Sequence, residues 1–536
     1  MKKPVHPPFQ MSIEDEFDSF EACGEGDADC NLVQSANQEQ HLLAQVGTLD
    51  DLYLNIVSSP LQFCDEEIAK LSGFNSQISP LVEANEEKSY AFPTASMEIL
   101  RGCRSRNRMS NEAEVKASPP SEMSINHVIK LAAANFIRSK MACASELYAI
   151  SHLYADAFLG LPEENSRDVR LVQDLLSSAE RVNAHQFDSA SKLLEECHKQ
   201  SFKQMNKTQR LVYYFTQALF EKIERGGGKC TKEMETLRDP PTPSSATAAF
   251  FEKLPFSQIT QFTAVQSMVE NISGYRKVHV VDLELRCGVH QTILMQAMAA
   301  ARACTVHFKI TAIAIEASTV IEEAGVRLRA IANSLNVDFS FNVLTLEDVF
   351  NLQISIFDID EDEAVIVHSA HALEKLVSRP RELDVLMRII RRINPHVMII
   401  TEAEGNVNSP AFVDRFVESL LFCGAYFDSL GDLLRSGGAE RSFIEANILS
   451  PVVRNTVAAE GGERGHRIVG IEVWRAFLGR FGMVEMELSK VALTHARMIL
   501  DRFECGDCCT LGFNGDSLIV SWKETPICSL SVWKFG

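Results

Sequence analysis

VHVVDLEL, at positions 278–285, is a run of apolar and β-favouring residues that opens the part of the chain that decides the fold. Helical stretches separate it from later runs of the same kind, which are KITAIAIE (309–316), DFSFNVLT (338–345), AVIVHS (364–369) and HVMIITEAE (396–404). Strands that are apolar throughout are buried on both faces, and alternating helices cover those faces in a parallel sheet. The sequence therefore predicts a doubly wound α/β fold.

The C-terminal end of the chain follows a different pattern. After MVEMEL (483–488) and one helix, short links join TLGFNG (510–515), SLIVSWKE (517–524) and SLSVWKF (529–535). A parallel return needs a crossover of a dozen or more residues, so these links permit only antiparallel pairing. We therefore predict an α/β fold class with a Rossmann-like, methyltransferase-type sheet that is mostly parallel and is completed by C-terminal antiparallel strands.

Residues 124–230 have a helical period. One apolar stripe consists of Val172, Leu175, Leu176, Ala179 and Val182. LVYYFTQALFEKI (211–223) is a further helix, which the glycines at 226–228 close. We predict one domain over 124–536, divided into a helical cap (124–230) and an α/β core (231–536).

Residues 1–123 are predicted to form a disordered acidic arm, because no helical or strand period is sustained there. Within the arm, TLDDLYLNIV (48–57) surrounds Asp50 and Asp51 with apolar residues. This mixture suits a short segment that becomes helical on a partner, and it is equally typical of a stray hydrophobic cluster in a linker.

Charge and hydropathy restrict the classes of partner. A formal net charge of −20 disfavours sequence-independent binding to phosphate backbones, so we expect protein partners first and DNA through them or through a limited basic surface. The first residues lack the apolar run of a secretory signal, and charges interrupt every apolar stretch before it could span a membrane. We expect an intracellular protein without membrane contact, in which the 14 cysteines are mostly buried thiols.

The loop after the first strand, from Asp282 to His290, is where related folds bind a cofactor. It has a single glycine, Gly288, and the bulky Glu284 and Arg286 stand where the backbone of a G-x-G turn would be bare. Glu316 ends the second predicted strand, as does the acid that holds ribose hydroxyls in nucleotide-binding folds. An acid at a strand end is commonplace, so we expect no cofactor. A cofactor- or small-molecule-binding methyltransferase-like protein remains the alternative.

Other motifs are weaker. GGGK (226–229) lacks the spacing of a phosphate-binding loop, and Cys505 with Cys508 has no second ligand pair nearby in the sequence. His368 and His371 follow an apolar strand at a spacing usual for a hydrogen-bonded loop or helix start. We therefore expect no catalytic residue, no cofactor and no metal site.

Five blocks in fixed order resemble the GRAS family of plant regulators over roughly 124–536. The VHIID-type motif reads Val278, His279, Val280, Val281, Asp282. The other blocks are a first leucine-rich region (171–200), a second one (326–344), a PFYRE-type region (393–430, then 452–467) and a SAW-type end (468–536). NSPAFVDRF (408–416) and RNTVAAEG (454–461) are nearly intact family strings.

This resemblance implies a nuclear regulator of transcription. It implies action through contacts with other transcription factors, homo- or heterodimers within the family and, in some members, binding to promoter DNA. It also implies a helical cap beside an α/β core. No DELLA-like string occurs in the first 115 residues, so we expect no role in gibberellin sensing. RGCRSRNR (101–108) is the nearest approach to a nuclear import signal.

Within these blocks the sequence suggests several roles. We expect the valines of the VHIID-type motif to be buried and Asp282 to make hydrogen bonds at the strand end. Three leucines of the first block are candidate partner contacts, although most of that block should be core. These are Leu171, Leu175 and Leu176. Arg454, Asn455 and Glu460 suggest a polar network between helix and sheet. A local basic patch for DNA or an acidic partner consists of Arg464, His466 and Arg467.

Overall fold

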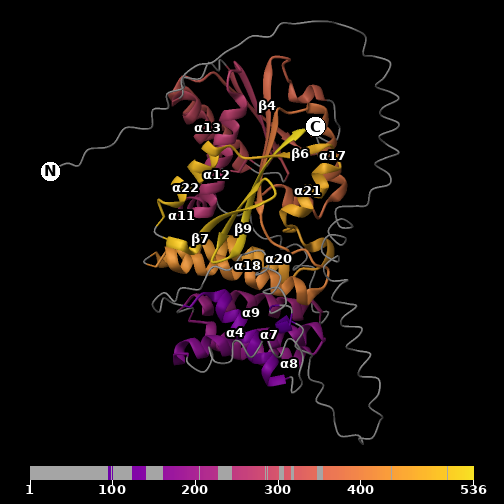
Figure 1. Cartoon of the computed structure of the whole chain (residues 1–536). Helices are drawn as coiled ribbons and strands as arrows, with labels where there is room; N and C mark the ends of the chain where they lie inside the picture. The colour runs from indigo at the N-terminus through magenta and orange to yellow at the C-terminus, as the bar shows by residue number, and fades with distance from the viewer. Residues whose placement is uncertain are drawn as a thin grey trace, which may run out of the picture.

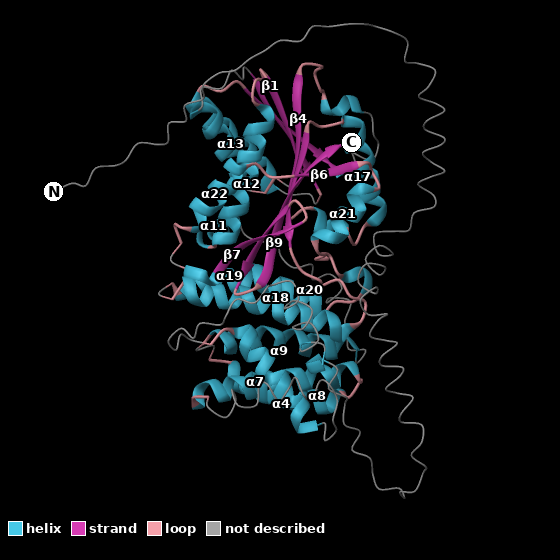
Figure 2. Ribbon diagram, in the orientation of Figure 1, coloured by secondary structure: helices cyan, strands magenta, loops and turns pink. Residues whose placement is uncertain are grey.

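The structure is a computed structural model of the whole chain (Figures 1 and 2). It describes residues 95–97, 99, 123–140, 161–203, 206–226, 244–283, 285–286, 288–300, 307–315, 319–346, 354–435, 437–503 and 505–536. Several features of the sequence therefore lie outside the described residues. These are most of the predicted arm at 1–123 with its segment 48–57, the arginine-rich run at 101–108, residues 227–229, Glu284 and Glu316.

Among the described residues, nine strands form one sheet in the order β3-β2-β1-β4-β5-β9-β8-β7, with β6 paired to β9. The first five pair in parallel. They are β1 (Lys277–Leu283), β2 (His307–Ala314), β3 (Phe339–Thr345), β4 (Glu363–Ala370) and β5 (Val397–Ala403). The others pair antiparallel. They are β6 (Met483–Met486), β7 (Cys509–Asn514), β8 (Ser517–Trp522) and β9 (Thr525–Phe535).

Strand β9 joins the two parts of the sheet. One edge pairs with β5, where Met398 lies opposite Trp533, and the other edge pairs first with β8 and then with β6. The parallel part with its antiparallel completion confirms the predicted fold class.

Helices cover both faces of the sheet, on either side of it in Figure 2. On one face lie α11 (Ser244–Lys253), α12 (Pro255–Ile272), α13 (Val289–Ala300), α14 (Thr319–Leu335) and α22 (Lys490–Leu500). On the other lie a 3-10 turn (Ile354–Phe357), α16 (Leu373–Leu376), α17 (Pro380–Ile393) and α21 (Ile471–Gly479). Alternate residues of β1 point into the two cores, with Val278 and Val280 in the first and Val281 and Leu283 in the second.

Helix α17 shows how local sequence sets these elements. Pro380 lies in its first turn, where a missing N–H has no cost, and Asn394 ends it in the left-handed conformation with φ 48°. Its buried residues, which include Leu383, Leu386 and Ile390, recur at helical spacing and face the second core. The amphipathic pattern of RPRELDVLMRIIRRI thus fixes which side of α17 meets the sheet.

The helical cap lies below the sheet in Figure 1. It contains α4 (Ile125–Lys140), α7 (Glu163–Asn183), α8 (Phe187–Ser201) and α9 (Lys207–Gly226). Between the cap and the sheet lie α18 (Phe412–Leu433), α19 (Gly438–Ile444), a π-helical turn (Glu445–Leu449) and α20 (Ser450–Val457). Helix α18 follows the predicted boundary at residue 230 and packs against α4 and α9, which precede that boundary, and against β9, so this layer joins the cap to the sheet. No helix of the described residues is long and apolar enough to cross a bilayer.

Candidate functional site at the carboxyl ends of the strands

The carboxyl ends of β1 and β4 mark the place where a doubly wound sheet usually binds its ligand. The two strands are neighbours, and the chain leaves them towards opposite edges of the sheet, β2 and β3 on one side and β5 on the other. Such a change of direction opens a crevice between the loops that follow the two strands. The side chains in these loops therefore decide whether a cofactor has room.

Asp282, the acid of the VHIID-type motif, is engaged in a buried hydrogen-bond network. In the register of the sheet it lies opposite His368, and its Oδ2 lies 2.6 Å from His368 Nδ1. The side-chain amide of Gln291, in α13, donates to the same oxygen. All three side chains are buried. The motif thus holds β1, β4 and α13 together, and its valines are core residues as the sequence predicts.

His290 extends this network. Its ring lies 4.7 Å from that of His368, centroid to centroid. Burial, together with the neighbouring His368, His371 and Arg286, holds the pKa of His290 well below its ordinary value, so the imidazole is neutral. A neutral, buried histidine packed on another ring fills space at the strand end and offers no charge to a substrate.

Arg286 bridges the crevice itself. It adopts the left-handed conformation with φ 52°, and its Nη2 donates to the backbone oxygen of His371 at 2.9 Å. This bond links the loop after β1 to the loop after β4. The nearby Gly288 has φ 72°, and a Cβ there would lie 3.2 Å from Leu328 Cδ1, so the loop packs closely on α14. The one glycine of the loop therefore serves helix packing.

A second polar cluster lies beside this bridge. His371, Glu374 and Glu402 each place one potential ligand atom within 4.8 Å of the others. Burial raises the pKa of Glu402 well above its ordinary value, with the carboxylate of Glu374 adding to the effect. Burial also lowers the pKa of His371 to about 4. For Glu374, burial acts to raise the pKa, but the hydrogen bond from His466 outweighs burial and holds this pKa below its ordinary value.

The candidate partner contacts in the first leucine-rich block are placed in the core. Leu171, Leu175 and Leu176 lie on α7 and pack inside the helical cap. Contact between these leucines and a partner stays a prediction, and it would require the cap helices to open.

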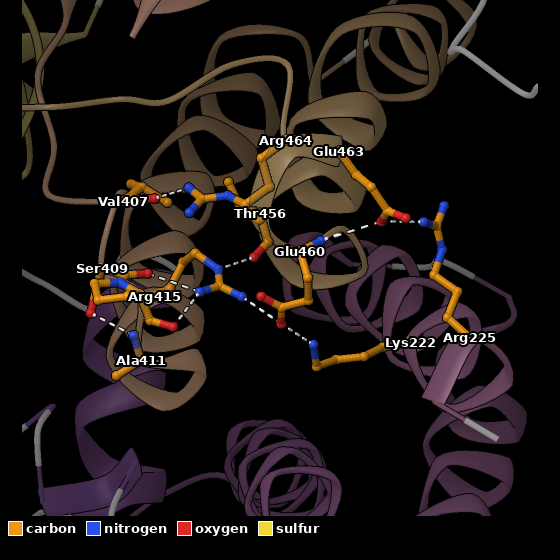
Figure 3. Close-up of polar contacts among 12 residues, drawn as sticks. Lys222, Arg225, Val407, Ser409, Ala411, Arg415, Thr456, Glu460, Glu463 and Arg464 are labelled. Carbon is orange, nitrogen blue, oxygen red and sulfur yellow. Dashed lines mark hydrogen bonds and ion pairs between the residues drawn. The ribbon is translucent and has the colours of Figure 1, made fainter. Parts of the chain in front are cut away.

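The predicted basic patch is only partly a surface feature. Arg464 is buried, and its Nη2 donates to the backbone oxygen of Val407 at 2.7 Å (Figure 3). His466 has 45% of its side chain exposed, and Arg467 is half-buried, with Nη2 donating to Gly461 O at 3.1 Å. With Arg464 buried, the part of the patch that reaches the surface consists of His466 and Arg467, and both are half-buried.

Arg415 is the centre of the polar contacts drawn in Figure 3, and its side chain is only 1% exposed. Its guanidinium donates to Thr456 O at 2.8 Å, to Ser409 O at 2.8 Å and to Glu460 Oε1 at 2.8 Å. Lys222, on α9 of the cap, is ion-paired with the same oxygen of Glu460. The two family strings therefore fold against each other and against the cap.

Two further ion pairs reinforce that junction. Arg225 Nη1, also on α9, lies 2.7 Å from Glu463 Oε2, and Arg454 Nε lies 2.5 Å from Glu221 Oε2. The sequence predicts that Arg454, Asn455 and Glu460 join helix to sheet, but Arg454 and Glu460 pair with side chains of α9 in the cap, and Asn455 donates to His466 O at 2.7 Å. The sequence could not show this, because each partner on α9 lies more than two hundred residues away.

Replacing Glu460 by Gln should destabilise the protein by about 1–2 kcal/mol, because the charge-assisted bond to buried Arg415 is weakened. Arg415 keeps its two backbone acceptors, Thr456 O and Ser409 O. Glu463→Gln is the matched control, since the two carboxylates are similarly exposed, 50% and 57%, but Glu463 pairs with the less buried Arg225. It should cost about 0–1 kcal/mol. Urea unfolding measures both, and equal losses would contradict the central place given to Arg415.

The Cys505 and Cys508 pair behaves as ordinary structural cysteines. Cys505 is buried, Cys508 is half-buried, and burial is the main cause that raises the pKa of both thiols. Within the part of the chain that the structure describes, no second ligand pair joins them, and the three-residue group at His371 is the one that could hold a metal ion. The sequence missed Glu374 and Glu402 in that group because they come from different elements.

Comparisons with known proteins agree on one family. The family model described as the GRAS domain family matches residues 171–534. Similar curated proteins include DELLA protein GAI1 of Vitis vinifera, 28% identical over 395 residues, with 70% of this chain and 65% of the relative covered. DELLA protein RGL3 of Arabidopsis thaliana is 29% identical over 370 residues, with 69% of this chain and 70% of the relative covered. The alignments thus span about two thirds of these relatives' lengths.

Among solved structures, SCL7 of Oryza sativa superposes with a TM-score of 0.57 at 23% sequence identity, covering 68% of this chain and 99% of that chain. At this identity the likeness establishes the fold.

Proposed function

The chain belongs to the GRAS domain family, and from this membership we propose that it regulates transcription in plant nuclei through contacts with other proteins, without catalysing a reaction. The observation that carries the proposal is the bond from Arg286 to His371 O across the crevice where related folds bind a cofactor. An enzyme-shaped sheet whose ligand position is bridged by its own side chains suits a scaffold for partners.

The surrounding residues support this reading. Asp282, the acid of the first strand end, already accepts hydrogen bonds from His368 and Gln291. A ribose or an adenine would have to displace these bonds and leave buried polar groups without partners, which costs about 1–3 kcal/mol for each group. The binding free energy of a cofactor would therefore first have to compensate for the loss of hydrogen bonds that hold the sheet together.

The partners we propose are other transcription factors, including a second GRAS protein in a homo- or heterodimer. Promoter DNA is proposed to be reached through such partners. The net charge of −20 opposes approach to a phosphate backbone. Of the predicted basic patch, Arg464 is buried and both His466 and Arg467 are half-buried.

A reporter assay in plant protoplasts tests the regulatory role. The full chain, fused to a heterologous DNA-binding domain, should change the expression of a reporter that carries the matching sites, and the untethered chain should be found in the nucleus. Glu463→Gln is the folded control and should act like the wild type. A tethered, folded and nuclear protein that leaves expression unchanged would contradict the proposal.

A second candidate, a cofactor-binding methyltransferase-like protein, is favoured by the strand order β3-β2-β1-β4-β5, which is that of cofactor-binding sheets. Titration of the full chain with S-adenosylmethionine in a calorimeter separates the two functions. We expect no binding heat. Saturable binding that Glu316→Ala weakens would replace the first proposal by the second.

A further inference from the structure

Three side chains converge beside the bridged crevice from separate elements. His371 follows β4, Glu374 lies in the first turn of α16, and Glu402 lies in β5. His371 is held with φ 56°, and its backbone N–H donates to Thr401 O at 2.8 Å, which fixes the end of β4 against β5. One potential ligand atom from each of the three residues lies within 4.8 Å of the other two.

The cluster has unused acceptors. Glu402 is 1% exposed, and its Oε1 accepts a hydrogen bond from Leu373 N at 2.9 Å. Its Oε2 and the Oε2 of Glu374 are buried, and neither has a hydrogen-bond partner within the described part of the chain. Buried carboxylate oxygens without a donor are costly unless something positive occupies the space between them.

Two basic side chains lie beside the cluster. They are Arg286, whose Nη2 donates to the backbone oxygen of His371, and His466, whose Nδ1 lies 3.7 Å from Glu374 Oε1. In these contacts neither group donates to Glu402 Oε2. The two unpartnered oxygens belong to neighbouring carboxylates, Glu374 and Glu402. A bound proton or a bound cation would neutralise their negative charge.

We propose that His371, Glu374 and Glu402 bind a divalent transition-metal cation, with Zn²⁺ as the probe. One imidazole nitrogen and two carboxylate oxygens form a donor set that suits zinc. Tetrahedral zinc with ligands at about 2.0–2.2 Å needs donor atoms about 3.4 Å apart, so the side chains must move together by about 1 Å. Rotation about the side-chain bonds of the two glutamates supplies a movement of that size.

His466 offers a fourth donor. Its ring nitrogen already lies near Glu374, and the loop that carries it is fastened by Arg467 N, which donates to Glu374 O at 3.0 Å. Four protein donors make a closed, structural zinc site. The cation would tie the ends of β4 and β5 to the loop before α21. This role is independent of the regulatory function proposed above, since metal binding and reporter activity are measured separately.

The competing explanation is a shared proton. In this explanation Glu402 stays protonated, as its raised pKa favours, and donates its proton in a hydrogen bond to Glu374. The two carboxyl groups then need no metal. The two explanations differ in whether the purified protein takes up Zn²⁺.

The test uses the full chain, stripped with a chelator and titrated with ZnCl₂ in a calorimeter, with bound metal counted by mass spectrometry. We expect one saturable zinc per chain in this cluster and a higher melting temperature when it is bound. Glu402→Gln, which keeps the shape of the side chain, should weaken zinc binding by at least about tenfold. Cys505→Ser with Cys508→Ser is the matched control and should bind as the wild type does.

Two results would overturn the proposal. They are a wild-type protein that takes up no zinc and a Glu402→Gln variant that binds it as tightly as the wild type. Circular dichroism establishes that each variant is folded. If Glu402→Gln does not fold, His371→Asn replaces it, because asparagine tolerates the left-handed backbone of that position and lacks the imidazole.

Discussion

Deletion of residues 525–536 is expected to abolish the cooperative unfolding transition of the α/β sheet. The deleted strand, β9, pairs with β5 on one edge and with β8 and β6 on the other. Its side chains enter both cores, with Leu530 in the first and Trp533 in the second. Without β9 the ladder groups of β5 and β8 lose their partners and both cores open at one end.

Far-ultraviolet circular dichroism and calorimetry measure this result. The truncated chain should lose strand signal and show no single calorimetric transition. Removal of Gly536 alone is the control, because it deletes only the bond from Gly536 N to Gly482 O and should leave the transition in place. A normal cooperative melt of the 525–536 deletion would show that the two parts of the sheet are stable without the strand between them.

Asp428→Ala is expected to destabilise the protein by about 3–5 kcal/mol, because it leaves buried donors without their acceptor. Asp428 Oδ1 accepts from Ile125 N at 3.1 Å and lies 2.8 Å from Lys207 Nζ. Its Oδ2 accepts from Trp522 Nε1 at 2.9 Å and lies 2.5 Å from Lys523 Nζ. One carboxylate on α18 thus joins α4 and α9 of the cap to the C-terminal strands.

Asp432→Ala is the matched control for this variant. Asp432 contacts the same two lysines, at 3.1 Å from Lys207 Nζ and 2.6 Å from Lys523 Nζ. Its side chain is 16% exposed, and the Trp522 indole donates to Asp428 instead. Its loss should cost about 1 kcal/mol in urea unfolding. Equal losses from the two variants would show that charge alone, and not the buried junction, stabilises the cap.

The pH dependence of Asp428→Ala has a definite sign. Burial opposes the shift, but Lys207 and Lys523 outweigh it and hold the pKa of Asp428 below its ordinary value of 3.8. The folded protein therefore binds this proton less readily than the unfolded chain does. The stability difference between wild type and Asp428→Ala should be constant above about pH 5 and shrink only as the pH falls below 3.8. A difference that already shrinks near neutral pH would contradict this ion pairing.

The sequence predicted the features that local pattern determines. Continuous apolar runs such as 278–285 and 396–404 became the central parallel strands, and the short links after residue 509 became antiparallel turns. The apolar stripe predicted from Val172 to Val182 became the buried face of α7. The resemblance to the GRAS family, which rested on five ordered blocks, is confirmed by the match over 171–534.

Features that depend on long-range packing could not be predicted. Arg464 looked like part of a basic surface because three cationic residues are close in sequence, but the loop turns its guanidinium inward to Val407 O. Arg415 is a lone arginine in an apolar helix, and its acceptors at Thr456, in α20, and at Glu460, in the loop after α20, lie 41 and 45 residues further along the chain. Asp428 likewise gives no local signal, because Ile125 and Trp522 lie about 300 and 94 residues away from it.

The position of β9 has a consequence for how the protein is made. Synthesis proceeds from β1 to β9, so β5 leaves the ribosome long before the strand that covers its edge. During that interval the growing chain carries an apolar parallel sheet with an open side, which is the kind of surface that aggregates or recruits chaperones. Native folding of this molecule is therefore expected to be completed after translation of its last strand and to depend on protection of β5 until then.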